Sequence, residues 1–296
     1  MVSVIAQAHN SKRICLLFNF QLFLIFFKYT KHNYFKFLDK NNKFIPWFLG
    51  FCDAECSFIT NLVSRKNKQN LITSYRIFYR IQIGLNIIDR PILDYINKNL
   101  NNIGKIYDYE TRQESTLCFI SLETIRYLID NIFIENPLLT SYQSNRFAKL
   151  KKGISKNIGG VKTIEEYESI FKNIEEVIPK FENCSQFYLD HWLIGFLNGE
   201  VSFTSFKGKK DVLKPKISLE HTVPLGEAAL IFFKNHLKLG PKICQLKQRQ
   251  NRKITYRIDI TSVNDLNKIC KFLDYRDCLI GNKLNQYSNW KIKFNL

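Results

Sequence analysis

Apolar residues recur along this chain with two periods, one typical of strands and one typical of helices. In Ser74–Gly84 every second residue is isoleucine, tyrosine or another apolar residue, with arginine and glutamine between them. This alternation predicts a strand with one buried face. From Asp89 to about Leu100, apolar residues instead keep helical spacing behind a proline, which predicts a helix that ends before Gly104.

The same order of elements is predicted twice. The rest of the first half is expected to contain strands at Ile106–Glu110 and Leu117–Ser121, a helix near Glu123–Phe133 and another from about Pro137. The second half is expected to contain strands Ser202–Lys207, Lys216–His221, Lys242–Arg249 and Lys253–Ile260, and helices Glu227–Leu237, Asn264–Leu273 and Leu279–Trp290. Repetition of the order indicates a tandem duplication.

The chain is expected to divide into four segments. These are an N-terminal extension outside the fold (1–43), a first half (44–148), a linker (149–184) and a second half (185–296). The linker begins with a run that we predict to be flexible, Lys151–Gly160, followed by a Glu-rich helical segment, Ile164–Ile178.

The duplication is clearest in a short stretch that occurs once in each half. Trp47–Phe58 reads WFLGFCDAECSF and Trp192–Phe203 reads WLIGFLNGEVSF, and the two align without a gap. Each copy is an apolar segment that ends in a carboxylate, Glu55 or Glu200, beside the start of a predicted strand.

Small residues in this repeated stretch predict how its two copies pack. They lie four residues apart on each predicted helix, which suits two helices whose backbones approach closely: Gly50, Ala54, Gly195 and Gly199. Such packing would bring Glu55 and Glu200 together at one end. Because neighbouring carboxylates repel unless a cation or a shared proton lies between them, the pattern predicts a divalent-metal site.

Composition indicates a folded protein with a polyanionic partner. The 296 residues are 45% hydrophobic and 14% aromatic, which argues against disorder. Forty-four Lys and Arg against 26 Asp and Glu give a net charge of +18, so nucleic acid is the first candidate partner and a membrane surface the second. The eight cysteines show no metal-ligand spacing, and we interpret them as reduced core residues.

One N-terminal segment, Ile14–Phe27, is strongly apolar but short for a bilayer-spanning helix, which needs roughly 20 residues. Basic residues precede it, as in a secretory signal, but no small-residue cleavage site follows. A membrane or targeting role is the alternative. We expect an appendage outside the fold and no stable membrane partner.

The repeated stretch resembles the double motif of LAGLIDADG homing endonucleases. FLGFCDAEC and LIGFLNGEV fill the nine motif places, with Glu55 and Glu200 at the eighth, the metal-binding acid of that family. The departures are Cys56 and Val201 at the ninth place and Asn198 at the sixth. The resemblance implies an α/β (α+β) fold of two pseudo-symmetric αββαββα halves, packed through the motif helices, with two antiparallel DNA-binding sheets.

The polar faces of the predicted strands carry the expected recognition residues. Arg, Lys and Gln can bond phosphates and donate to base edges. The nucleic-acid-binding candidates are Arg76, Arg80, Gln82, Lys216, Gln245, Lys247, Arg249, Lys253 and Arg257. The alternative is that these are ordinary solvated strand faces.

The resemblance also implies a lysine near the start of the last helix of each half and a polar residue at the end of the second strand. Lys283 fills the lysine place in the second half, but the first half has Tyr142 there. At the strand end the second half has Glu220, which we expect to be catalytic together with Glu55, Glu200 and Lys283. Leu85 or Asn86 stands at that place in the first half.

The resemblance implies a monomeric, site-specific homing endonuclease that uses Mg²⁺ to make double-strand breaks in DNA and promotes intron mobility. The alternative is a maturase that helps its host group I intron RNA to splice, with weak or no DNA cleavage. A third alternative is a catalytically silent nucleic-acid-binding protein. The abundance of Asn, Lys, Ile, Phe and Tyr is typical of an AT-rich organellar gene, so we expect a mitochondrial rather than a plastid origin.

Overall fold

The computed structural model describes residues 42–178, 180–221, 227–246, 254–276 and 279–296. The apolar segment Ile14–Phe27, in the expected N-terminal extension, lies outside the described residues. No helix in the described part of the chain has both the length and the apolar character needed to cross a bilayer.

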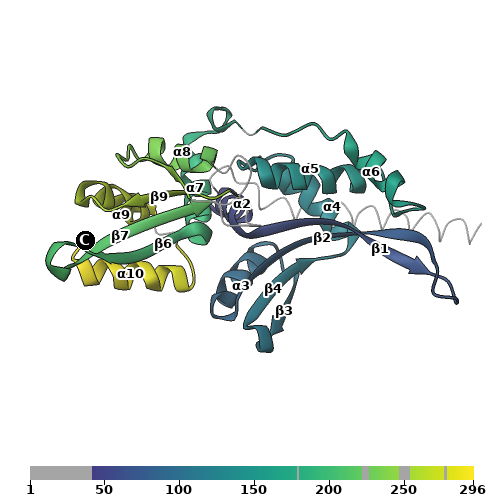
Figure 1. The fold of residues 1–296 in the computed structure, drawn as a ribbon, viewed down its shortest axis with the longest axis horizontal. Helices are drawn as coiled ribbons and strands as arrows, with labels where there is room; N and C mark the ends of the chain where they lie inside the picture. The colour runs from purple at the N-terminus through teal and green to yellow at the C-terminus, as the bar shows by residue number, and fades with distance from the viewer. Residues whose placement is uncertain (1–41, 179, 222–226, 247–253, 277–278) are drawn as a thin grey trace, which may run out of the picture. The chain divides into compact units, whose positions relative to one another are not determined.

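Two helices of the repeated stretch pack against each other between the two halves (Figure 1): α2 (Phe44–Glu55) and α7 (Gln186–Glu200). A Cβ atom added to Gly50 would lie 1.8 Å from the carbonyl oxygen of Trp192. A Cβ added to Gly195 would lie 1.8 Å from that of Trp47. The contact is therefore reciprocal, and glycine is the residue that lets the backbones approach this closely.

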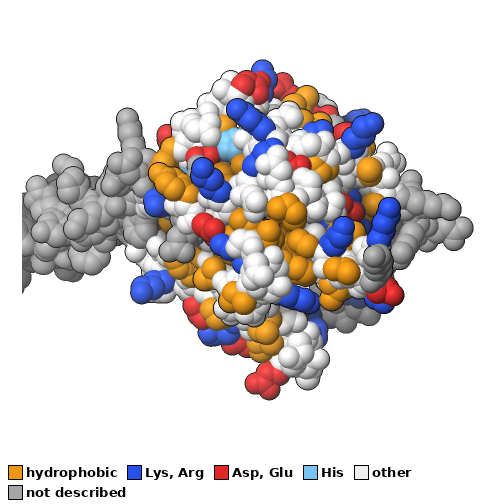
Figure 2. Space-filling model, turned by 90° about the vertical axis from the view of Figure 1, so that its left-hand side faces the viewer, with side chains coloured by type: hydrophobic (Ala, Val, Ile, Leu, Met, Phe, Trp, Pro, Cys, Tyr) orange, Lys and Arg blue, Asp and Glu red, His pale blue; other side chains and the backbone are white. Residues whose placement is uncertain are grey.

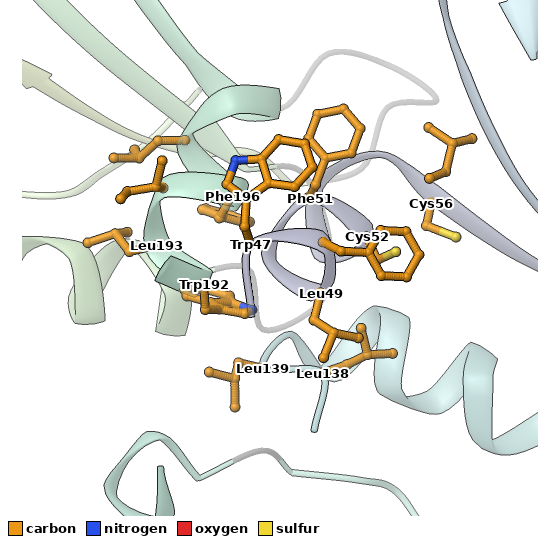
Figure 3. Close-up of a cluster of buried hydrophobic side chains, with 14 of the residues drawn as sticks. Trp47, Leu49, Phe51, Cys52, Cys56, Leu138, Leu139, Trp192, Leu193 and Phe196 are labelled. Atoms are coloured by element: carbon orange, nitrogen blue, oxygen red, sulfur yellow. The ribbon is translucent and has the colours of Figure 1, made fainter. Parts of the chain in front are cut away.

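Aromatic residues of the same two helices fill the space around this contact (Figure 3). The rings of Trp47 and Phe51 stack with centroids 5.3 Å apart, and those of Trp192 and Phe196 with centroids 5.1 Å apart. All four side chains are buried. The burial of such large apolar surfaces contributes strongly to the stability of the central contact.

The first half follows α2 with a sheet and its covering helices. Its elements are β1 (Cys56–Lys66), β2 (Ile72–Asn86), α3 (Arg90–Asn99), β3 (Lys105–Tyr109), β4 (Glu114–Phe119), α4 (Leu122–Leu128) and α5 (Ser141–Ser155). The antiparallel strands lie in the order β1-β2-β4-β3, and β5 (Gly160–Val161) also pairs with β2.

The second half repeats this arrangement after α7. Its elements are β6 (Val201–Lys207), β7 (Leu213–His221), α8 (Glu227–His236), β8 (Cys244–Gln245), β9 (Tyr256–Ile260), α9 (Val263–Arg276) and α10 (Asn282–Phe294). The strand order β6-β7-β9-β8 matches that of the first sheet. The predicted α/β class, with two antiparallel sheets in two similar halves, is confirmed.

Short turns complete the described elements. Single 3₁₀ turns lie at Ile87–Asp89, Glu110–Arg112, Phe181–Asn183 and Lys209–Asp211, and a π-helical turn at Ile129–Phe133 extends α4. The helix predicted near Glu123–Phe133 thus consists of α4 and this turn.

The alternating pattern of β2 is seen in the structure. Ile77 and Ile81 are buried in the core, whereas Arg76 is exposed and Arg80 is half-buried on the other face. The strand is longer than the predicted Ser74–Gly84, because its ends pair with β1 and β4 beyond the alternating segment.

The start of the expected linker belongs to the first half. The boundary placed at Lys149 falls inside α5, and the run predicted to be flexible holds the end of that helix and the first residue of β5. Gly153 packs on the ring of Tyr79, whose hydroxyl donates to the carbonyl of Ile158 at 2.7 Å. The predicted helix Ile164–Ile178 is shorter than expected, since α6 spans Ile164–Lys172.

The cysteines partly follow the expectation. Those in the described residues are free, and Cys52, Cys56, Cys118 and Cys270 are buried. Cys244 is exposed, so the interpretation of all the cysteines as core residues is wrong there. It lies on β8, a short strand at the sheet edge where one neighbouring strand is missing.

Candidate functional site

Two carboxylates mark the point where the central helices end. Glu55 is the last residue of α2 and Glu200 the last of α7, and β1 and β6 begin immediately after them. A Cβ added to Gly199 would lie 2.6 Å from the Cβ of Ala54 and 3.1 Å from the Cγ of Glu55, so the helix ends pack tightly. Both acids line one cavity of about 290 Å³, together with Ser57, Tyr142, Gln143, Arg146 and His221.

The electrostatics of the cavity show that the two acids act on each other. Burial, and then the charge of Glu200, raise the pKa of Glu55 to about 7, although the charge of Lys283 opposes this rise. The charge of Asp89 makes a smaller contribution to the same rise in the pKa of Glu55. A divalent cation between the carboxylates would relieve this repulsion.

The donor set fits a hard cation held by few protein ligands. The described residues contain no cluster of three or more His, Cys, Asp or Glu side chains that could hold an ion. A cation here would therefore take its protein ligands from Glu55 and Glu200. Mg²⁺ commonly binds one or two carboxylates and completes its coordination with water and phosphate oxygens.

Lys283 lies close enough to this acid pair for the charges of both acids to act on it. It stands in the first turn of α10, and its Nζ donates to the carbonyl of Val201 at 2.7 Å. Burial lowers the pKa of Lys283, whereas the charges of Asp89, Glu55 and Glu200 raise it. Asp89 was not among the predicted site residues, and its position follows only once the second half packs on the first.

Equivalent hydrogen bonds set the positions of α5 and α10. Asp53 accepts from the backbone N–H of Leu139 at 2.7 Å, and Asn198 accepts from that of Ile280 at 2.7 Å. The helices then begin at Ser141 and Asn282. This equivalence makes Tyr142 the counterpart of Lys283.

Sequence reasoning missed Gln143, the residue after Tyr142. Its side-chain amide donates to the carbonyl of Cys56 at 2.6 Å. Cys56 starts β1 as Val201 starts β6, so this bond is equivalent to the one that Lys283 makes. The first half therefore keeps the hydrogen bond to the strand start but makes it with a neutral group.

Glu220 does not reach the cavity. Its carboxylate pairs with Arg257 at 3.2 Å, and its side chain is 46% exposed. The next residue, His221, lines the cavity instead, with its Nδ1 3.3 Å from a carboxylate oxygen of Glu200. Successive strand residues face opposite sides, so a shift of one position moved the prediction to the wrong face.

The predicted recognition residues of the first sheet share one face of β2. Arg76 is exposed, while Arg80 and Gln82 are half-buried and joined by a hydrogen bond of 3.1 Å. The guanidinium of Arg80 also lies 4.8 Å from the ring centroid of Phe78.

Two predicted recognition cations of the second sheet, Lys216 and Arg257, are paired with acids. Asp259 lies 3.8 Å from Lys216 and 2.9 Å from Arg257. Gln245 is exposed but lies opposite Tyr256 in the strand register, so it does not share the face of Arg257. The predicted residues Lys247, Arg249 and Lys253 lie outside the described residues.

Basic side chains are spread over one face of the molecule. Figure 2, which looks at the left-hand side of Figure 1, shows Lys and Arg side chains scattered over that face between hydrophobic and acidic ones. The net charge of +18 therefore adds a broad attraction for polyanions to the strand-face residues.

Comparisons with known proteins agree with this geometry. Residues 48–154 match the family model described as LAGLIDADG endonuclease. The "Probable intron-encoded endonuclease Cox1-I1b" of Schizosaccharomyces pombe is 23% identical over 256 residues, a match that takes in 83% of this chain. The match spans 63% of the length of that curated relative.

Solved structures share the fold. The LAGLIDADG homing endonuclease I-GzeII in complex with its DNA target is 21% identical, with a TM-score of 0.64 over 83% of this chain and 88% of that chain. I-LtrWI bound to target DNA is 19% identical, with a TM-score of 0.63 over 86% and 90%. I-SmaMI bound to uncleaved DNA in the presence of calcium ions is 19% identical, with a TM-score of 0.58 over 83% and 88%.

The first half matches the family model, and both halves carry the motif helix with its terminal acid within the shared two-halved fold. The first half thus carries a match to the LAGLIDADG endonuclease model, and the chain shares the two-halved fold of solved LAGLIDADG homing endonucleases.

Proposed function

We propose that this protein is a site-specific homing endonuclease that makes metal-dependent double-strand breaks in DNA. The observation that supports this best is the cavity shared by Glu55 and Glu200 at the ends of the central helices. One carboxylate comes from each half, so the site combines both halves of one chain. A single chain thus supplies both acids, and we propose that it acts as a monomer.

Phosphodiester hydrolysis fits the residues around this cavity. A divalent cation, which we propose to be Mg²⁺, would be held by Glu55 and Glu200 and would supply charge neutralisation and an activated water. Lys283 adds a positive charge beside the acids. His221 contacts Glu200 and can orient its carboxylate.

The substrate that we propose is double-stranded DNA, bound along the polar faces of the two sheets. The net charge of +18 favours binding to a polyanion, and the similar solved structures named above hold DNA. Arg76 and Arg80 would contact the DNA from the first sheet, and Lys216 and Arg257 from the second.

The likeness to a protein named as intron-encoded supports a role in intron mobility. The composition supports an organellar origin, which we propose to be mitochondrial. The relative and the solved structures are named as endonucleases, which favours cleavage over the alternative of a maturase acting on its host intron RNA.

A cleavage assay tests this proposal. Purified protein with Mg²⁺ and DNA carrying the uninterrupted insertion site of its own reading frame should give linear product. Glu55→Gln and Glu200→Gln should each abolish cutting while DNA binding persists. Glu168→Gln, at an exposed acid on α6, is the matched control and should cut normally. Undiminished cutting by both site variants would refute the assignment.

A further inference from the structure

The last helices of the two halves differ in the placement of one cation and one aromatic residue. In the second half, Lys283 stands in the first turn of α10 and Tyr287 stands one turn later. In the first half, the equivalent positions on α5 hold Tyr142 and Arg146. The cation and the tyrosine have thus exchanged places along the helix. Residues four apart lie on the same helix face, so the first half still presents a cation on that face.

Arg146 is placed to serve the cavity. It lines the cavity together with Tyr142, Glu55 and Glu200. Its guanidinium carbon lies 5.2 Å from the ring centroid of Tyr142, which holds the side chain by a cation–π contact. Within the described residues no carboxylate forms an ion pair with Arg146 at 4.0 Å or less. Among the described residues, its guanidinium is thus not neutralised by a carboxylate.

Tyr287, the counterpart of Arg146, has a different role. It is buried, and its hydroxyl donates to a carboxylate oxygen of Asp274 at 2.7 Å. Tyr287 thus belongs to the packing between α9 and α10, and the second half supplies its cation from Lys283 instead. One half therefore supplies an arginine that lines the cavity, and the other supplies a lysine whose charge acts on the acid Glu55.

We propose that Arg146, held on the ring of Tyr142, binds the scissile phosphate of one DNA strand. This inference rests on the proposed endonuclease function and extends it to one residue and one strand. Guanidinium groups bind phosphate oxygens with two parallel hydrogen bonds, and their charge is permanent. Arg146 binds charge that the phosphate already carries, and it takes no proton from the reacting water. Lys283 serves the site on the opposite strand.

The two cuts then depend on different residues. Loss of Arg146 should slow the cutting of one strand by about ten- to a hundredfold, the usual effect of removing a hydrogen bond to a charged group. The other strand should be cut at nearly the wild-type rate. Loss of Lys283 should slow the cutting of the strand that Arg146→Ala still cuts at nearly the wild-type rate.

The test uses the full chain, Mg²⁺ and two DNA substrates that carry the insertion site. One is a supercoiled plasmid, which reports nicking. The other is a linear duplex with one or the other strand end-labelled, which reports the cutting of each strand. Wild-type protein should give linear product. Arg146→Ala should accumulate nicked circles with one strand intact, and Lys283→Met should nick the other strand. Arg146→Lys should restore only part of the lost rate, because it returns the charge but not the two parallel hydrogen bonds. Glu168→Gln, at an exposed acid on α6, should cut like wild type.

Two further measurements separate a local effect from misfolding. Arg146→Gln keeps hydrogen-bond donors and much of the side-chain size but removes the charge. If Arg146→Ala lowers the melting temperature, the strand preference of Arg146→Gln tests the proposal in its place. DNA binding in EDTA should change little in either variant. Equal cutting of both strands by Arg146→Gln, or an equal slowing of both, would overturn the inference. A wild-type chain that cuts neither strand would instead overturn the proposed function, and this inference with it.

Discussion

Glu55 links the stability of the protein to pH and to metal. Burial and the charge of Glu200 raise its pKa in the folded chain from 4.5 to about 7. Ionisation of Glu55 is therefore less favourable in the folded state than in the unfolded state. Protonated Glu55 therefore contributes to the free energy of unfolding. This contribution is at its maximum below about pH 4.5 and is lost as the pH rises through about 7.

We therefore predict that, in EDTA, the melting temperature of the wild-type protein falls between about pH 5 and about pH 8 relative to that of Glu55→Gln. Glutamine keeps the shape of the side chain and does not titrate. Added Mg²⁺ should stabilise the wild type at the higher pH and leave Glu55→Gln nearly unchanged, because the cation offsets the repulsion that the variant lacks. Parallel pH profiles for the two proteins in EDTA would contradict the prediction.

At the residue scale, the sequence predicted the acids better than their neighbours. Glu55 and Glu200 stand out because the stretch around them occurs twice. The choice between Glu220 and His221 depends on which face of β7 meets the cavity, and no repeat marks that register. Arg146 lies a helical turn beyond the motif position, so only the packing of α5 reveals it.

The contact between the central helices depends on the absence of two side chains. A Cβ at Gly50 would overlap the carbonyl of Trp192 at 1.8 Å, and backbone cannot turn aside as a side chain can. The helices would have to separate, which would expose the stacked aromatic rings around them.

We predict that Gly50→Ala lowers the free energy of unfolding by about 3 kcal/mol or more, since overpacking alone costs about 1–3 kcal/mol in a well-packed core. Gly159→Ala is the control, because a Cβ there meets no atom within 4 Å. Urea denaturation followed by tryptophan fluorescence measures both variants. Similar midpoints for the two would show that the helices can separate without loss.

At the scale of helices and strands, the alternating and helical patterns predicted most of the order of the elements. They failed where contacts between distant parts of the chain determine the secondary structure. Lys149 and the residues after it carry no strong apolar period, so they resembled a linker. In the structure, Leu150 and Ile154 are buried against the first half, and Val161 pairs with Tyr75 at the edge of β5. Such contacts join residues far apart in the chain, which local composition does not reveal.

At the scale of the whole molecule, the two sheets differ in charge although their topology matches. On the face of the first sheet that carries Arg80, the register places Arg65, Arg76 and Lys105, with Glu114 as the one carboxylate. Among the described residues of the second sheet, the face of Arg257 carries Lys214 and Lys216 but also Glu220 and Asp259. The first sheet therefore has the greater excess of cations available to DNA phosphates.

Salt dependence of DNA binding should reveal this difference. Each phosphate contact contributes about 0.9 to the slope of log affinity against log salt concentration. Arg76→Ala with Arg80→Ala should lower that slope by about 2, because neither arginine pairs with a carboxylate among the described residues. Lys216→Ala with Arg257→Ala should lower it by less, because their removal also frees the acids that neutralise them.

Anisotropy titrations without divalent metal, over a series of salt concentrations, measure both slopes without cleavage. The comparison is matched, since each double variant removes two positive charges from one sheet face. If DNA binding depended on net charge alone, the salt-dependence slope would fall by the same amount in both double variants, and the acids paired with Lys216 and Arg257 would have no effect. A larger loss for the first sheet would instead show that intramolecular ion pairs decide which half of the protein holds the phosphates more strongly.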